Sequence, residues 1–375
     1  MSALDLLSGD AQTFLAKVWA SRVHLHRTDP ADLVGLLSLD DADHLLTSTA
    51  IRTPAIRMAQ DGAVLPESSY TRGATLAGKP VTGLVDARKA LALFDGGATV
   101  VFQGLQRYWP PLTRLIAELE LELGHPCQAN AYLTPPGSQG FAVHSDSHDV
   151  FVFQTAGHKQ WEGHTPDGVE DIRLEPGLSL YLPTGTPHAA RAQDTVSLHV
   201  TIGINQLTWR GLLRRTMERL VAEVPDDHLP AGYLDDPSLL ATPLAARLAA
   251  LADELRAVDP AGVVGAEAER FLTTRPTRQR GGLLDVLDVR DLSDDTALRR
   301  RAGKPCVLVA GATTDRVRVL LGDRVLEMPA WVRPALEDLR VRRGLTPADL
   351  TMLDAQSRLV LCRRLVREGL LEISR

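Results

Sequence analysis

One stretch of the chain, residues 130–188, carries a pattern of histidine and carboxylate side chains that limits what the chain can fold into. His144 and Asp146 are separated by one residue, and His188 follows much later in the same stretch. Residues i and i+2 of an extended chain point to the same side, so His144 and Asp146 can reach one ion together. With His188 arriving from a distant strand, they would form the 2-His-1-carboxylate triad of non-haem Fe(II) oxygenases. A hydrogen-bonded surface pair and a turn-capping histidine would also fit these residues.

The same stretch predicts many short strands. They are separated by Gly, Pro, Asp or Asn and have the sequences CQANAYL, FAVHSD, DVFVFQTAG, KQWEGH, LSLYLP, AARAQD and SLHVTIGIN. Short strands at regular spacing indicate a sandwich or a barrel. We therefore predict an α+β protein whose core is a double-stranded β-helix, a jelly roll of the cupin type. The mouth of such a barrel can hold a metal between inward-facing side chains.

The flanking segments predict further domains, because 375 residues exceed the usual size of a single domain. Short capped helices precede the strands, so the first domain would comprise residues 1–206. Helices with apolar faces follow over residues 207–274, and these faces suit a dimer interface. Residues 275–375 alternate short strands and helices in an order that resembles a winged helix.

Composition and charge narrow the possible partners and the location. The formal net charge of −6 argues against nucleic acid or an anionic membrane, and we expect the arginines of the last domain to lie on a solvated face. Three cysteines far apart predict no disulfide framework and fit a reducing compartment. No apolar run approaches the ~20 residues of a membrane span, and the first residues lack the features of a secretory signal. We therefore expect a cytoplasmic protein.

Three polar residues near the triad are candidates for binding a cosubstrate. Lys159 lies in TAGHKQW and would supply the cation that an iron oxygenase needs for the distal carboxylate of 2-oxoglutarate. A solvated strand lysine is the alternative. Asn130 and Tyr132 share a face of an alternating strand, and each can donate a hydrogen bond to a cosubstrate, although polar lining or core packing would also explain them. His199, in an apolar strand, is expected to be a core histidine or a support for the ligands.

Taken together, these residues resemble the JmjC-type ribosomal oxygenases, a family of cupin-like protein hydroxylases. The family pattern runs N-x-Y-x-T-P, then G-x-x-x-H-x-D, D-V-F-x-x-Q-x-x-G-x-K-x-W and P-x-G-x-x-x-Y-x-P-x-x-x-x-H. This chain matches it nearly throughout with NAYLTPPGSQGFAVHSDSHDVFVFQTAGHKQW and EPGLSLYLPTGTPHAA. The predicted order of oxygenase domain, helical dimerisation region and winged-helix-like domain also resembles that family.

The resemblance implies Fe(II) bound by the triad, with no catalytic side chain beyond the metal ligands. The cosubstrate would be 2-oxoglutarate, held at its C5 carboxylate by Lys159, with Asn130 and Tyr132 nearby. The implied reaction is C3-hydroxylation of an arginine or a histidine in a ribosomal protein, and the implied assembly is a homodimer. Two alternatives stay open: hydroxylation of a ribosomally made natural-product precursor peptide, and a non-catalytic metal-binding regulator.

Overall fold

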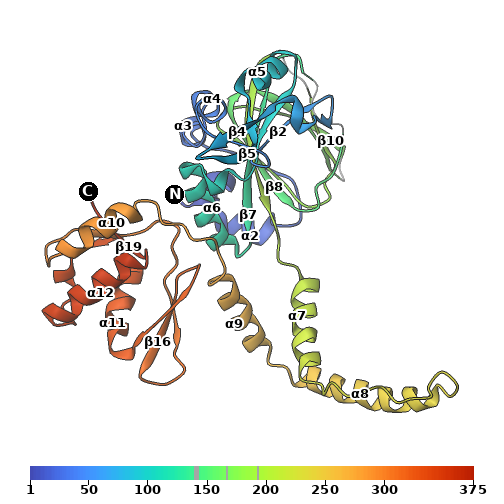
Figure 1. Cartoon of the computed structure of the whole chain (residues 1–375), viewed down its shortest axis with the longest axis vertical. Helices are drawn as coiled ribbons and strands as arrows, with labels where there is room; N and C mark the ends of the chain where they lie inside the picture. The colour runs from blue at the N-terminus through green and yellow to red at the C-terminus, as the bar shows by residue number, and fades with distance from the viewer. Residues whose placement is uncertain (139–142, 166–167, 192–193) are drawn as a thin grey trace. The chain divides into compact units, whose positions relative to one another are not determined.

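The computed structural model describes residues 1–138, 143–165, 168–191 and 194–375 (Figure 1). The chain divides into two compact units. The first contains Met1–Gln206 and two short returning segments, Arg280–Leu284 and Arg301–Lys304. The second contains Leu207–Gln279, Asp285–Arg300 and Pro305–Arg375. The predicted regions 207–274 and 275–375 both fall mainly in the second unit, and our division of the chain into three domains stays a prediction.

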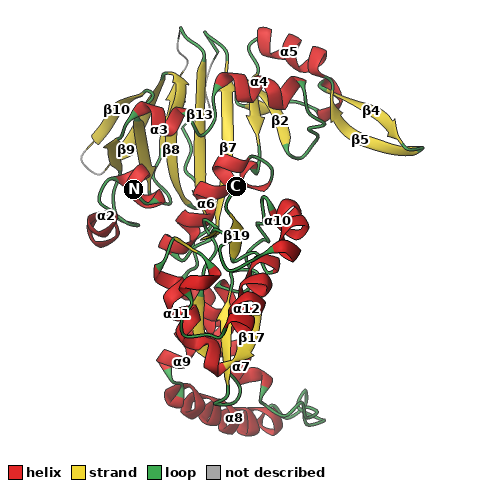
Figure 2. Ribbon diagram, turned by 90° about the vertical axis from the view of Figure 1, so that its left-hand side faces the viewer, coloured by secondary structure: helices red, strands yellow, loops and turns green. Residues whose placement is uncertain are grey.

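The first unit is built on an antiparallel sheet of eight strands in the order β1-β11-β8-β13-β7-β6-β2-β3 (Figure 2). These are β1 (His24–Arg27), β2 (Ile56–Gln60), β3 (Ala63–Val64), β6 (Thr99–Phe102), β7 (Cys127–Thr134), β8 (Asp149–Gly157), β11 (Leu178–Leu182) and β13 (Ser197–Ile204). A smaller antiparallel sheet has the order β10-β9-β12 and consists of β9 (Lys159–Thr165), β10 (Gly168–Leu174) and β12 (His188–Arg191). A separate hairpin pairs β4 (Thr71–Leu76) with β5 (Lys79–Val85).

Side-chain alternation gives the large sheet two different faces. On one face, Phe151 and Phe153 of β8 and Val200 of β13 join the main core, to which the N-terminal helices also contribute. On the other face, Val150 and Val152 of β8 join a second core with residues of the small sheet. The helices are α1 (Ala3–Ser8), α2 (Ala11–Lys17), α3 (Pro30–Val34), α4 (Leu39–Thr47), α5 (Ala87–Asp95) and α6 (Pro110–Leu123). The barrel interior therefore lies between the large and the small sheet.

Local sequence explains why α6 forms where it does. Two prolines occupy its first turn, where the missing N–H has no helical partner to lose. Gly124 ends it in the left-handed conformation at φ 69°. Leu112, Ile116 and Leu119 are buried along one side, and each such side chain stabilises the fold by about 1.5–3 kcal/mol relative to exposure. The result is a helix that packs firmly against β7.

The second unit has its own core and consists of helices and two small sheets. Its helices are α7 (Trp209–Ala222), α8 (Ser238–Ala257), α9 (Pro260–Phe271), α11 (Arg333–Val341) and α12 (Ala355–Arg367), while α10 (Gly282–Asp288) contains residues of both units. Its strands are β14 (Leu298–Arg300), β15 (Val307–Ala310), β16 (Arg316–Leu320), β17 (Val325–Pro329), β18 (Gly344–Leu345) and β19 (Leu371–Ile373). The winged-helix assignment stays a prediction. No helix of the described chain combines the length and the apolar character needed to cross a membrane.

Candidate metal and cosubstrate site

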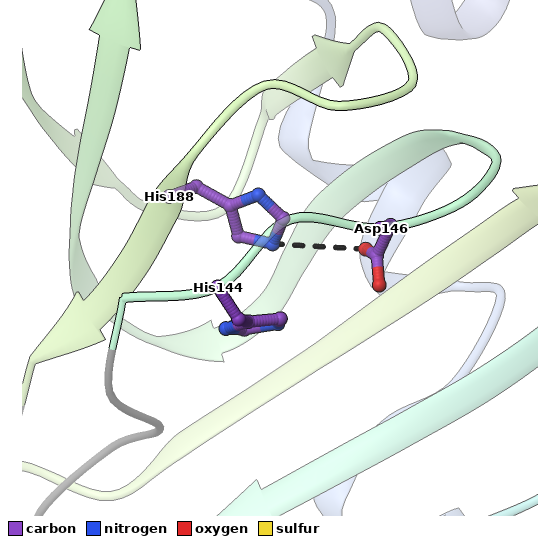
Figure 3. A group of neighbouring side chains, drawn as sticks. All are labelled: His144, Asp146 and His188. Carbon is purple, nitrogen blue, oxygen red and sulfur yellow. Dashed lines mark ion pairs between the residues drawn. The ribbon is translucent and has the colours of Figure 1, made fainter.

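His144, Asp146 and His188 lie close together, although His188 is far from the other two in the sequence. Their nitrogen and oxygen donor atoms all lie within 4.8 Å of one another. His188 Nε2 is 3.6 Å from Asp146 Oδ2, and the centroids of the two imidazole rings are 4.5 Å apart. Figure 3 shows the three side chains converging from separate segments. This donor set, two imidazoles and one carboxylate, fits a first-row metal such as Fe(II).

Backbone hydrogen bonds bring the two ligand-bearing segments together. The N–H of His144 donates to the His188 carbonyl at 3.0 Å, and the N–H of His188 donates to the His144 carbonyl at 2.8 Å. The Gly185 N–H donates to the Asp146 carbonyl at 3.0 Å. Our prediction of a strand over residues 141–146 was wrong for residues 143–146, since only His144 forms a β-bridge there. Residues 141 and 142 lie outside the described residues.

The protonation state of His188 suits a metal ligand. Its Nδ1 lies 2.9 Å from the Thr186 carbonyl oxygen, which can only accept, so Nδ1 carries the proton and the Nε2 lone pair is left for a metal. Burial lowers the pKa of His188 below its ordinary value, and the hydrogen bond to Thr186 opposes this effect in part. The imidazole is therefore neutral at neutral pH.

Lys159 is a buried cation at the start of β9. Lys159 is only 3% exposed. Its ammonium group donates a hydrogen bond to Thr134 Oγ1 at 3.3 Å. Burial lowers the pKa of Lys159 to about 8. No carboxylate of the described residues forms an ion pair with it. A buried charge without a counterion is unfavourable by several kcal/mol, so this position fits an anionic ligand.

Aromatic rings connect the lysine to the metal ligands. Measured between ring centroids, Tyr132 stacks on His199 at 5.0 Å and Trp161 meets His199 edge-on at 5.5 Å. The Trp161 centroid also lies 5.9 Å from that of His188. Trp161 Nε1 and His199 Nδ1 are buried, and neither has a hydrogen-bond partner in the described part of the chain. Burial, together with the charge of Lys159, holds the pKa of His199 well below its usual range. Buried polar atoms of this kind are normally satisfied, which again fits a polar ligand.

The two other predicted cosubstrate residues lie on one face of β7. The Gly104 N–H donates to Asn130 Oδ1 at 3.0 Å, so the Asn130 carbonyl oxygen is already engaged. Tyr132 lies opposite His199 in the register of β7 and β13. Their assignment to the cosubstrate stays a prediction.

Sequence reasoning overlooked Thr134 and Trp161 and gave His199 only a supporting role. The alternation that links Asn130 and Tyr132 continues to Thr134 in NAYLT, so this signal was available. The same spacing relates Lys159 to Trp161 in KQW. For His199, the register that places it opposite Tyr132 is a property of strand pairing, and no local pattern contains it.

The class of protein follows from a family match to this same region. The JmjC domain family matches residues 106–167 and 164–212, which include all six predicted site residues. The chain therefore contains a JmjC domain, and the mixed α+β cupin-type core is confirmed. The predicted resemblance to the ribosomal oxygenases is confirmed by similar curated proteins.

Among curated proteins, rat ribosomal oxygenase 1 is 30% identical over 59% of this chain and 41% of its own length. The human protein of the same name is 28% identical over 59% of this chain and 38% of its own length. The bifunctional lysine-specific demethylase and histidyl-hydroxylase NO66 of Branchiostoma floridae is 36% identical over 38% of this chain and 24% of its own length. The matched part of the chain thus spans about a quarter to two-fifths of the length of these relatives.

Solved structures extend the likeness to the whole fold. The ribosomal oxygenase YcfD of Escherichia coli matches 98% of this chain and 99% of its own, with a TM-score of 0.54 at 19% identity. A second YcfD structure, in complex with cobalt and 2-oxoglutarate, covers the same shares with a TM-score of 0.52 at 18% identity.

Proposed function

We propose that this protein is an Fe(II)- and 2-oxoglutarate-dependent protein hydroxylase. The observation that carries the proposal is one site with two complementary parts. A 2-His-1-carboxylate group fits the metal, and a buried lysine without a carboxylate partner in the described residues fits the cosubstrate anion. The relationship to ribosomal oxygenases supports this combination.

Each residue of the site has a distinct proposed role. His144, Asp146 and His188 would hold the metal, while Lys159 would neutralise the C5 carboxylate of the cosubstrate, with Asn130 and Tyr132 nearby. Iron(II) with 2-oxoglutarate supplies the oxidising power by which O₂ converts a C–H bond into C–OH, with release of succinate and CO₂. The protein itself orients the reactants and excludes water, and the hydrogen bond to Thr186 keeps Nε2 of His188 unprotonated.

A turnover assay tests the proposal directly. Succinate formation would be measured with Fe(II), 2-oxoglutarate and O₂ for the full chain and for His144→Ala and Asp146→Ala. Loss of a metal ligand should reduce turnover by more than the roughly 10–100-fold that follows the loss of a residue hydrogen-bonded to a ligand. Thr113→Val is a matched control, because it removes only a helix hydroxyl that donates to the Trp109 carbonyl. Undiminished turnover by both ligand variants would refute the assignment.

We propose that the substrate is a ribosomal protein and that an arginine or a histidine is hydroxylated at C3. The names of the relatives, ribosomal oxygenase and histidyl-hydroxylase, support this substrate class. In a strain lacking the gene, one ribosomal protein should be lighter by roughly 16 Da, the mass of one oxygen atom. An active enzyme with unchanged ribosomal masses would instead point to another peptide substrate.

We also propose that the protein is a cytoplasmic homodimer that associates through α8. No residue of this 20-residue helix is buried within the chain. Its leucines recur at helical spacing along one side, at Leu240, Leu244, Leu248, Leu251 and Leu255. An apolar stripe of this kind suits a second copy of the same helix. Leu248→Glu should convert the dimer to a monomer in sedimentation velocity, whereas Asp253→Asn, on the opposite side of the helix, should not.

A further inference from the structure

We infer that Asp149 is a positioning residue that holds the 183–187 loop, which leads into His188 at the start of β12, against the 144–149 segment, which carries His144 and Asp146. The inference deepens the proposed function and rests on it. Asp149 is the first residue of β8 and is only 3% exposed. A buried carboxylate needs several hydrogen bonds to be tolerated, and the identity of its donors shows what it holds in place.

Asp149 receives hydrogen bonds on both of its oxygens. The Thr184 N–H and the Thr184 hydroxyl donate to Oδ1 at 2.8 and 2.6 Å, and the Tyr181 hydroxyl donates to Oδ2 at 2.5 Å. Gln206 Nε2 donates to the Thr184 hydroxyl oxygen at 2.6 Å, which orients that hydroxyl toward the carboxylate. Asp149 is not among the clustered donor atoms of the triad in the described residues, and its three hydrogen bonds go to Thr184 and Tyr181.

These bonds complete a series of cross-links between the two segments. At one end, His144 and His188 exchange backbone hydrogen bonds; next, the Gly185 N–H donates to the Asp146 carbonyl. At the other end, Asp149 holds Thr184, the residue next to Gly185. Without the Asp149 bonds, the described residues would keep the backbone contacts close to the ligands and the Gln206 amide, which donates to the Ser147 carbonyl at 3.5 Å and to Thr184. The Asp149 bonds therefore add the buried part of the support for the 3.6 Å separation of Asp146 and His188.

The network is anchored in the rigid core. Tyr181 is completely buried on β11, and its ring packs edge-on against Phe14 at 4.9 Å and stacks near Trp19 at 6.1 Å. Its hydroxyl oxygen also accepts the Ala20 N–H at 2.9 Å. Asp149 therefore transmits the fixed position of a core tyrosine to the otherwise irregular loop.

The experiment uses the full chain and Co(II) alone, so it does not depend on turnover. Thr184→Val removes the hydroxyl that donates a hydrogen bond to Asp149 and keeps the branched shape of the side chain. Thr184→Ser restores the hydroxyl, and Thr113→Val is a matched control remote from the loop. The Co(II) dissociation constant, the d–d absorption spectrum at saturation and the melting temperature would be measured for each. Asp149→Asn would be added, since it alters the carboxylate itself.

Thr184→Val should raise the Co(II) dissociation constant about 10-fold, the lower end of what outer partners of metal ligands contribute. It should also shift the d–d spectrum, while its melting temperature stays near that of Thr113→Val. Thr184→Ser should bind Co(II) like the unaltered chain. If Thr184→Val, or Asp149→Asn that remains folded, binds Co(II) with unchanged affinity and spectrum, the inference is wrong. If the unaltered chain itself binds no Co(II), the proposed metal site fails, and that result is distinguishable from the first.

Discussion

The two ends of the proposed site are built in different ways. At the metal end, His144 is exposed, Asp146 is half-buried and His188 is buried. His144 and Asp146 lie in an irregular segment that backbone hydrogen bonds hold to the start of β12 and to the loop before it. At the lysine end, Lys159, Thr134 and His199 are buried and come from regular strands. The strands of Thr134 and His199 pair directly, and Lys159 reaches Thr134 through a hydrogen bond. The end that would admit a protein substrate is therefore partly exposed, whereas the end that would hold a small anion is buried between regular strands.

This contrast also has an electrostatic side. At the metal end, burial favours the neutral form of His188, and Asp146 is only partly buried, so neither is an uncompensated buried charge. At the lysine end, burial penalises the charged form of Lys159, and only a ligand anion would compensate for it. We therefore expect substitutions at the lysine end to act on cosubstrate affinity and those at the metal end to act on metal affinity and turnover.

The largest effect should come from Lys159→Ala. Removing one partner of a buried ion pair costs about 3–5 kcal/mol, so KM for 2-oxoglutarate should rise by roughly 100-fold or more. Co(II) affinity should change little, since Lys159 is not among the clustered donors. Lys89→Ala, an exposed lysine of the same unit, is the control. If Lys159→Ala has an unchanged KM for 2-oxoglutarate, or loses Co(II) affinity by as large a factor as its KM rises, the two ends do not have separate roles.

An intermediate effect should come from pH. Because burial lowers the pKa of Lys159 to about 8, its charge is lost above that pH in the protein without ligand. KM for 2-oxoglutarate should then rise by up to roughly 10-fold for each pH unit. The affinity for 2-oxoglutarate thus falls as the pH rises, whereas the stability of the ligand-free protein should rise. Between about pH 8 and 10.5 the unfolded chain binds more protons than the folded one, so stability increases with pH.

The pH effect can be assigned to Lys159 with one variant. Lys159→Arg keeps its charge at all these pH values, so its KM should not depend on pH between 8 and 10, whatever its absolute value. Steady-state kinetics at constant ionic strength would measure this. A KM that rises equally in both proteins would assign the titration to another group.

The smallest effect should come from Thr134→Val, which removes the hydroxyl that accepts from Lys159. A single hydrogen bond contributes about 0.5–1.5 kcal/mol net, so KM for 2-oxoglutarate should change only a few-fold. Thr134→Ser should restore the original KM. Should Thr134→Val instead abolish binding, the lysine end would depend on this one contact rather than on the enclosed pocket as a whole.

Much of this site could be predicted from local patterns, and the exceptions have a common origin. Alternation placed Asn130 and Tyr132 on one face of β7, and the same rule extends to Thr134, because the period of a strand is a local property. Trp161 of β9 and His199 of β13 meet because strands of two different sheets, distant in sequence, pack against each other. The predicted strand around His144 was wrong over residues 143–146 because only His144 pairs with a strand, at His188 of β12, while Asp146 accepts from Gly185 in a loop.

By itself, the sequence determined which side chains are chemically suitable, namely two histidines, a carboxylate and a lysine, and which face of each strand they occupy. Only the tertiary structure decided that His188 lies within reach of Asp146, that Lys159 is buried without a carboxylate partner in the described residues, and that Asp149 holds the loop between them. The physical reason is that periodicity along a strand is encoded locally, whereas register, burial and loop closure depend on contacts among residues far apart in the chain.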